Sequence, residues 1–160
     1  MAQIVEAVNE VYNIGKVRGA KLFLAGGITN CPDWLAELIE KIKDINHLVV
    51  YNPRRKNFPI HDPNAAEEQI VWEYEHLSAS NIIVFWFSRG SLNPIVLFEL
   101  GRYGFDEGKI VLIGLDPEYE RKMDVTIQTM IGRKYEQMSF YNNLDDIAKE
   151  IIDRTKYMTD

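Results

Sequence analysis

The chain has 160 residues, the length of one domain with a substantial core, and its formal net charge is −6. An acidic chain argues against a nucleic-acid polymer as partner, because phosphate backbones bind basic faces, but it leaves a single nucleotide open. No apolar run reaches membrane-spanning length, and the N-terminus lacks a signal-peptide pattern, so we expect no membrane partner. The only cysteine, Cys31, excludes an intrachain disulfide. We therefore expect a single domain over residues 1–160 in a reducing cytoplasm.

Short apolar segments alternate with amphipathic ones, and they predict the order of strands and helices. Residues 2–13 suit either a helical stripe or an edge strand, and we expect residues 1–20 to form an N-terminal arm or helix. Strands are expected at 21–25, 47–51, 81–87, 109–114 and 134–138. Helices are expected from Pro32 or Asp33 onward, and over 67–79, 93–105 and 144–155.

This alternation predicts βαβ units with right-handed crossovers around a parallel sheet. The expected fold is a three-layer α/β sandwich with a flavodoxin-like, five-stranded parallel sheet in the order 2-1-3-4-5. In such a sheet the ligand crevice opens at the carboxyl ends of the first and third strands, where the strand order reverses.

The turn after the first predicted strand carries Gly26 and Gly27, which allow a ligand to approach the backbone closely. A strand, a glycine turn and a helix also offer backbone N–H groups to an anion, although a plain tight turn accounts for the same residues. After the second strand, Arg54 and Arg55 either bind phosphate or carboxylate in a bidentate manner or belong to a solvated loop.

A single carboxylate, Glu99, stands inside the apolar segment 93–104. Asn93 and Pro94 are typical of a helix start, and the residues around Glu99 are largely apolar, so we expect the helix to be buried. A buried carboxylate is costly unless it is paired or used. Glu99 therefore either pairs with Arg102 at i,i+3 or performs chemistry.

The helix over 67–79 carries a second carboxylate, Glu73, which is either part of a solvated face or an acid of the site. Four apolar residues of this helix form a stripe that we expect to face inward: Ile70, Val71, Tyr74 and Leu77.

Cys31 and the three histidines show no metal-ligand spacing, so we expect no metal and no cofactor.

Six segments, taken in order, resemble the nucleoside 2-deoxyribosyltransferase-like family. They are Phe23–Ile28, Asp33-Trp34, Asn52–Arg55, Gln69–Glu73, Phe85–Phe87 and Pro94–Gly101, and the match runs from about residue 21 to at least 126. The resemblance implies the flavodoxin-like fold and cleavage of the N-glycosidic bond of nucleosides or deoxynucleoside monophosphates. The deoxyribosyl group then passes to another base or to water.

By position in the family motifs, Glu99 matches the nucleophile that attacks C1′ of the sugar, and Glu73 matches the acid that contacts the sugar or handles the proton of the leaving base. Gly26, Gly27 and Ile28 match the turn near the sugar and any 5′-phosphate. Four further residues are expected to take part in substrate binding: Trp72, Asn93, Tyr103 and Asp124. Tyr103 lies one helical turn after Glu99, and we expect it to hydrogen-bond the carboxylate.

Asp124 departs from the family pattern, in which an asparagine from a neighbouring subunit touches the 5′-hydroxyl. An aspartate there would repel a 5′-phosphate, which favours a nucleoside. The resemblance and the aromatic-rich helices at 64–79 and 93–105 predict a homo-oligomer whose ligand is a nucleoside or nucleotide. A non-catalytic nucleotide-binding module on the same fold is the alternative function.

Overall fold

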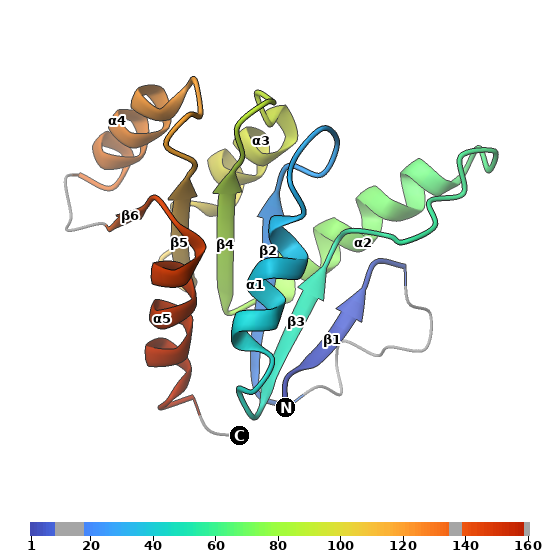
Figure 1. Cartoon of the computed structure of the whole chain (residues 1–160), viewed down its shortest axis with the longest axis horizontal. Helices are drawn as coiled ribbons and strands as arrows, with labels where there is room; N and C mark the ends of the chain where they lie inside the picture. Colours follow the sequence, from blue (N-terminus) through green and yellow to red (C-terminus); the bar gives the residue numbers. More distant parts are fainter. Residues whose placement is uncertain (9–17, 135–138, 159–160) are drawn as a thin grey trace.

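The computed structural model describes residues 1–8, 18–134 and 139–158 (Figure 1). Its strands are β1 (Gln3–Glu6), β2 (Ala20–Gly26), β3 (Leu48–Asn52), β4 (Ile82–Phe87), β5 (Ile110–Leu115) and β6 (Phe140–Tyr141). Its helices are α1 (Trp34–Ile42), α2 (Ala65–Ala79), α3 (Pro94–Tyr103), α4 (Lys122–Gly132) and α5 (Leu144–Thr155). The described strands form one sheet in the order β1-β3-β2-β4-β5-β6, with every neighbouring pair parallel.

The predicted fold class is confirmed, because β3-β2-β4-β5-β6 reproduces the order 2-1-3-4-5. A sixth strand, β1, adds to the edge beside β3 and buries Val5. Residues 3–6 therefore take the edge-strand alternative and not the expected helix, while 9–17 lie outside the described residues.

The last strand of the sheet also differs from the predicted strand at 134–138. Lys134 lies in the turn after α4, residues 135–138 lie outside the described residues, and the strand forms at Phe140–Tyr141.

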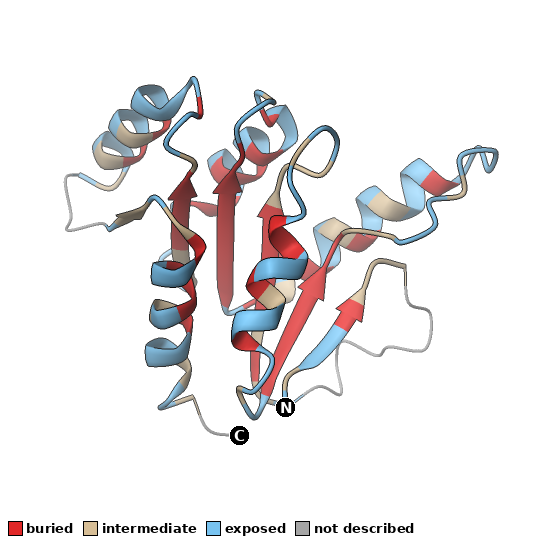
Figure 2. Ribbon diagram, viewed as in Figure 1, coloured by how far each residue is buried: buried red, intermediate tan, exposed pale blue. Residues whose placement is uncertain are grey.

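Two hydrophobic cores lie on the two faces of the sheet (Figures 1 and 2). Because side chains alternate along a strand, Phe23 and Ala25 of β2 face the α2, α3 and α4 side, while Leu22 and Leu24 face α1 and α5. The central strands are buried on both faces, as the red ribbon in Figure 2 shows. Phe23 and Ala25 therefore place their side chains on the face of β2 that α2 and α3 cover, and both line the cavity at its end.

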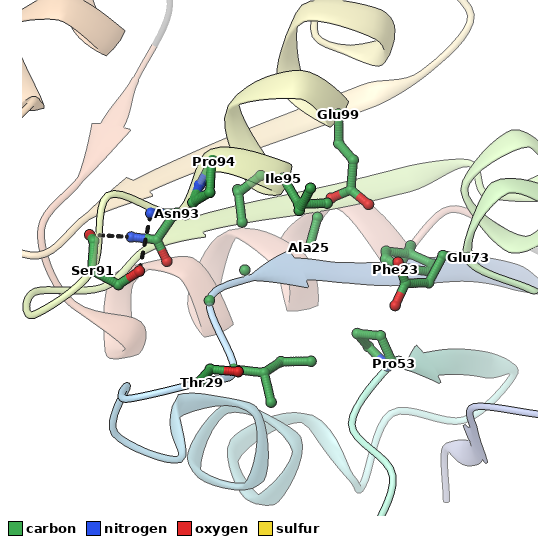
Figure 3. Close-up of a pocket in the computed structure, with 14 residues that line it drawn as sticks. Phe23, Ala25, Thr29, Pro53, Glu73, Ser91, Asn93, Pro94, Ile95 and Glu99 are labelled. Atoms are coloured by element: carbon green, nitrogen blue, oxygen red, sulfur yellow. Dashed lines mark hydrogen bonds between the residues drawn. The ribbon is translucent and has the colours of Figure 1, made fainter. Parts of the chain in front are cut away.

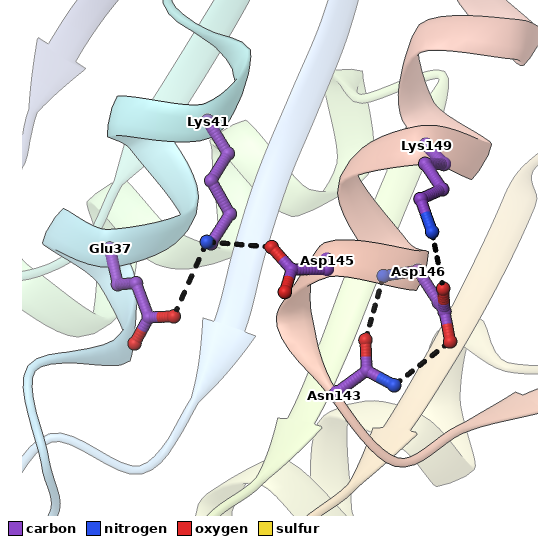
Figure 4. A network of polar contacts seen from close by, with 6 residues as sticks. All are labelled: Glu37, Lys41, Asn143, Asp145, Asp146 and Lys149. Atoms are coloured by element: carbon purple, nitrogen blue, oxygen red, sulfur yellow. Dashed lines mark hydrogen bonds and ion pairs between the residues drawn. The ribbon is translucent and has the colours of Figure 1, made fainter.

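Helices α1 and α5 lie side by side and cover one face of the sheet (Figure 4). Each begins with a side-chain cap: Asp33 accepts from the Ala36 amide, and Asn143 accepts from the Asp146 amide. Lys41 of α1 reaches Asp145 of α5 at 2.7 Å, but exposed pairs of this kind contribute about 1 kcal/mol or less. The packing of buried apolar residues therefore holds the two helices to the sheet: Leu35, Leu38, Ile42, Ile147 and Ile151.

The apolar stripe predicted to face inward on α2 is wrong for three of its four residues. Ile70, Val71 and Tyr74 are about half exposed or more, and among these four only Leu77 is buried. The sheet side of α2 is filled instead by Trp72 and His76, whose rings stack at 3.9 Å. Periodicity identifies apolar positions on a helix, but it does not tell which of two such faces packs on the sheet.

Helix α3, expected to be buried because its segment is apolar almost all round, is buried on one side only. Ile95 and Phe98 are 63% and 66% exposed, whereas Val96, Leu100 and the charged Glu99 are buried. The residues that α3 leaves exposed lie beside those of α2, because Ile70, Tyr74, Ile95 and Phe98 line one shallow depression. The chain thus carries an uncovered apolar surface, which we call the α2–α3 face.

Candidate active site

A cavity of about 340 Å³ opens at the carboxyl ends of β2 and β4, on the α2–α3 side of the sheet (Figure 3). This is the predicted switch point, and the volume lies within the range of small-molecule sites. The turn after β2, the loop after β3, α2, and the loop and first turns of α3 all contribute to its lining. Six of the predicted site residues line it: Gly26, Gly27, Ile28, Glu73, Asn93 and Glu99.

Glu99 is a buried carboxyl group in the wall of this cavity, with a residue exposure of 9%. Within the described parts of the chain, no hydrogen bond or ion pair reaches its carboxyl oxygens. Arg102, the alternative partner, stacks instead over the rings of Tyr74 at 5.1 Å and Phe98 at 5.6 Å. Burial first, and then the charge of Glu73, raise the pKa of Glu99 to about 8. Glu99 therefore holds a proton at neutral pH in the free protein.

We expect this raised pKa to make folding stability depend on pH. Between pH 4.5 and about 8 the folded chain keeps a proton on Glu99 that the unfolded chain releases, so stability falls as pH rises through this window. Glu99→Gln removes this contribution and should be more stable than the wild type at pH 8. Urea unfolding at pH 5 and pH 8 measures the difference. The exposed change Glu68→Gln on α2 should keep the wild-type pH dependence, and an equal dependence in Glu99→Gln contradicts the assignment.

Glu73 faces the same cavity from α2, as Figure 3 shows, but its surroundings differ from those of Glu99. Its carboxyl oxygen Oε1 accepts a hydrogen bond of 2.7 Å from Nε2 of Gln69. Burial raises the pKa of Glu73, and the bond from Gln69 opposes that rise. The two acids are therefore unequal, and of the pair only Glu73 has a donor among the described residues that stabilises its charged form.

Asn93 fixes the loop between β4 and α3. It has a φ of 52° and is buried, and its Nδ2 donates to the carbonyls of Ser88 at 3.0 Å and Ser91 at 2.8 Å. Asn93 was predicted to start α3, and Pro94 does follow it as the first helical residue, although the Asn93 side chain makes no capping bond. Its Oδ1 lies directly against Gly27, where a Cβ atom would overlap it. The turn after β2 and the start of α3 therefore touch only because residue 27 is glycine.

Gly27→Ala is expected to destabilise the protein by about 1–3 kcal/mol, because the methyl group displaces the Asn93 amide from the loop that it holds. Urea denaturation measures this change. Gly101→Ala is the matched control, since a Cβ at Gly101 meets no atom within 4 Å and lies in a helix. It should stabilise α3 by about 0.5–1 kcal/mol. Equal effects of the two substitutions contradict the close contact.

Three of the predicted substrate-binding residues, apart from the two arginines, do not line the cavity. Trp72 points from α2 toward the sheet and is buried there, with its ring centre 6.1 Å from that of Phe23. The Tyr103 hydroxyl pairs with Ser78 Oγ at 3.0 Å, so the expected bond to Glu99 is not formed. Asp124 lies on α4, in a separate groove between α3 and α4, and forms an exposed pair with Arg121 at 3.6 Å.

The two arginines after β3 directly follow Pro53, which lines the cavity. Arg54 forms an ion pair of 2.6 Å with Asp33, the residue that caps α1, and the guanidinium of Arg55 lies 5.3 Å from the ring centre of Phe58. Arg54 is thus paired, whereas Nη1 of Arg55 is buried without a hydrogen-bond partner within the described residues, and neither arginine lines the cavity. Their role in phosphate binding stays a prediction.

The described residues contain no group of three or more His, Cys, Asp or Glu side chains arranged to hold a metal ion. Among the described helices, none has the length and apolar character needed to cross a membrane.

The fold and the cavity define a class of protein: a flavodoxin-like α/β sandwich with two acids facing a small-molecule pocket at the switch point. The model of the family described as "nucleoside 2-deoxyribosyltransferase like" matches residues 19–119, more than half of the chain, and the protein belongs to this family. The matched range contains every residue that lines the cavity. A comparison with curated proteins finds no match.

Proposed function

We propose that this protein cleaves the N-glycosidic bond of a deoxynucleoside, a nucleoside or a 5′-monophosphate of either, by transfer of the sugar to another base or to water. The observation that carries the proposal is the pair Glu73 and Glu99, two unequal acids that face one cavity in a chain of this family. In the retaining mechanism of glycosidic cleavage, one carboxyl group attacks the sugar carbon and a second protonates the leaving group.

In the proposed reaction, an ionised oxygen of Glu99 attacks C1′ while the bond from C1′ to the base nitrogen breaks. Glu73 donates a proton to the departing base, and the sugar remains bound to Glu99 as an ester. A second base or a water molecule then attacks C1′, the ester bond breaks, and Glu73 accepts the proton that the attacking group loses. Two coupled, desolvated acids of this kind share one proton at neutral pH, so the proton must leave Glu99 before the attack.

The test is incubation of the protein with the deoxynucleosides and their 5′-monophosphates, with and without a free acceptor base. Release of the base alone identifies a hydrolase, and formation of a new nucleoside identifies a transferase. Binding without either product identifies the non-catalytic nucleotide-binding module. A preference for nucleosides over monophosphates agrees with a substrate-binding role for Asp124, whose charge repels phosphate.

We also propose that a second copy of the chain covers the α2–α3 face. Monomeric proteins rarely expose contiguous apolar patches, and this face combines exposed Ile70, Tyr74, Ile95 and Phe98. It adjoins the cavity, because Glu73, Ile95 and Glu99 border both depressions. Asp124 does not line the cavity of its own chain, so the role inferred for it from the family requires a neighbouring copy.

Phe98→Asp is expected to weaken self-association by at least about tenfold, because it places a charge at the centre of the proposed interface. Sedimentation equilibrium of the wild type and the variant at micromolar concentration measures the change. Tyr157→Asp also replaces an exposed aromatic residue by a charge, but it follows α5 on the other face of the sheet, where it is 88% exposed, and it should leave association intact. A wild type that sediments as a monomer excludes the interface.

A further inference from the structure

Gln69 connects two parts of the cavity wall without lining the cavity itself. It lies one helical turn before Glu73 on α2, and its Nε2 donates to Oε1 of Glu73 at 2.7 Å. The same nitrogen donates to the backbone carbonyl of Pro53 at 2.8 Å. Both acceptors belong to residues that line the cavity, so one amide group fixes Glu73 of α2 to the loop after β3.

The orientation of this amide is determined by what faces it. A carbonyl and a carboxyl oxygen are both acceptors, so only the NH₂ end of Gln69 satisfies them together. The carbonyl oxygen at the other end of the Gln69 amide is buried and has no hydrogen-bond partner within the described residues. The two bonds of the NH₂ end therefore fix the orientation. Rotating the amide by half a turn would set three oxygen acceptors against one another.

The fixed amide distinguishes the two oxygens of Glu73. Oε1 is bonded to Gln69 in either protonation state, as a carboxylate oxygen or as the carbonyl oxygen of the acid. A transferable proton therefore belongs on Oε2. Three charged or titratable residues of α3 border the same depression as Glu73: Glu99, Arg102 and Tyr103. Arg102 stacks over Tyr74 and Phe98, and the Tyr103 hydroxyl bonds to Ser78, so Glu99 is the group that interacts with Glu73 across the cavity. The loop after β3 presents the uncharged Pro53.

We propose that Gln69 is a positioning residue that holds Glu73 as the charged member of the pair in the free protein, and that directs the proton delivered to the leaving base onto Oε2 of Glu73. The catalytic half of this proposal rests on the proposed function, whereas the placement of the proton does not. The opposing effects of burial and of Gln69 on the pKa of Glu73 agree with the geometry.

The first test measures the proton directly. Carboxyl ¹³C NMR titration of glutamate-labelled protein, assigned with Glu73→Gln and Glu99→Gln, follows both acids in the wild type and in Gln69→Leu. Loss of the donor should raise the pKa of Glu73 by about one unit and lower that of Glu99, because the proton moves toward Glu73. Gln128→Leu makes the same change in the groove between α3 and α4, and should alter neither titration. Unchanged titrations in Gln69→Leu overturn the proposal.

A measurement on the wild type keeps the test decisive if Gln69→Leu does not fold. The side-chain ¹⁵N and amide proton signals of Gln69 should shift as Glu73 titrates, and Glu73→Gln should abolish that shift. Signals that do not respond to pH between 4 and 9 overturn the proposal.

The second test uses turnover. Gln69→Leu should lower kcat at least about tenfold for natural deoxynucleosides, with little change in KM, because the proton is no longer confined to Oε2 and Glu73 is no longer held in position to deliver it. This loss of orientation outweighs the easier ionisation of Glu99 in the variant. A deoxyriboside with a nitrophenolate leaving group needs no proton and should lose much less. Equal losses for both substrates overturn the catalytic half. A wild-type protein that cleaves neither substrate refutes the proposed function, and the NMR titration still decides where Gln69 places the proton.

Discussion

Replacing Glu99 with glutamine is expected to lower the rate of glycosidic cleavage by at least about 10³-fold, because the amide cannot form the ester with C1′. Glutamine is nearly isosteric with glutamate, and Glu99 has no hydrogen-bond or ion-pair partner within the described residues that the change would break. Removing a buried acid also removes the cost of ionising it at high pH. The variant should therefore stay folded and bind its ligand while it loses turnover.

Single-turnover cleavage by the wild type and by Glu99→Gln measures this loss. Mass spectrometry of the quenched wild-type reaction should reveal a sugar adduct on the peptide that contains Glu99, and the variant should show none. Glu75→Gln is the matched control, since this glutamate is exposed on α2 and should keep the wild-type rate. A fully active Glu99→Gln enzyme leaves Glu99 without a covalent role.

The sequence predicted the sheet well because its central strands are apolar runs buried on both faces, such as β4 at Ile82–Phe87. Right-handed crossovers then allow few strand orders. The edges were harder to predict. Strand β1 is four residues long, and β6 is two residues long, so neither provides a periodic pattern.

The candidate site was predicted through its acids and its glycine turn, and the errors follow from helix geometry. Successive residues of an α-helix point about 100° apart, so Trp72 and Glu73 do not both face the cavity. Tyr103 lies one turn after Glu99, but its hydroxyl is held by Ser78 of α2, a tertiary contact that no local pattern reveals. Gln69 was also missed, because its role depends on the Pro53 carbonyl sixteen positions earlier in the chain.

Glu73→Gln is expected to lower the rate with natural deoxynucleosides by about 10²–10⁴-fold, the contribution of a positioned general acid. The new side chain keeps its place, because its amide oxygen can still accept from Nε2 of Gln69. Its neutral amide should also lower the pKa of Glu99, since the Glu73 charge contributes to raising it. The substitution therefore removes the acid and makes the nucleophile easier to ionise.

These two effects separate when the leaving group is varied. In the wild type the pair must keep one proton to protonate a natural base, so kcat/KM should fall as pH rises past about 8, where Glu99 loses that proton. In Glu73→Gln a nitrophenyl deoxyriboside needs only ionised Glu99, and its cleavage should begin at lower pH than in the wild type and show no alkaline fall. The comparison requires kcat/KM for both substrates between pH 5 and 10, with Glu75→Gln as control.

If Glu73→Gln cleaves natural deoxynucleosides at the wild-type rate, the proton reaches the base from another donor. In that case the unequal surroundings of the two acids serve only to hold the proton on Glu99 in the free protein.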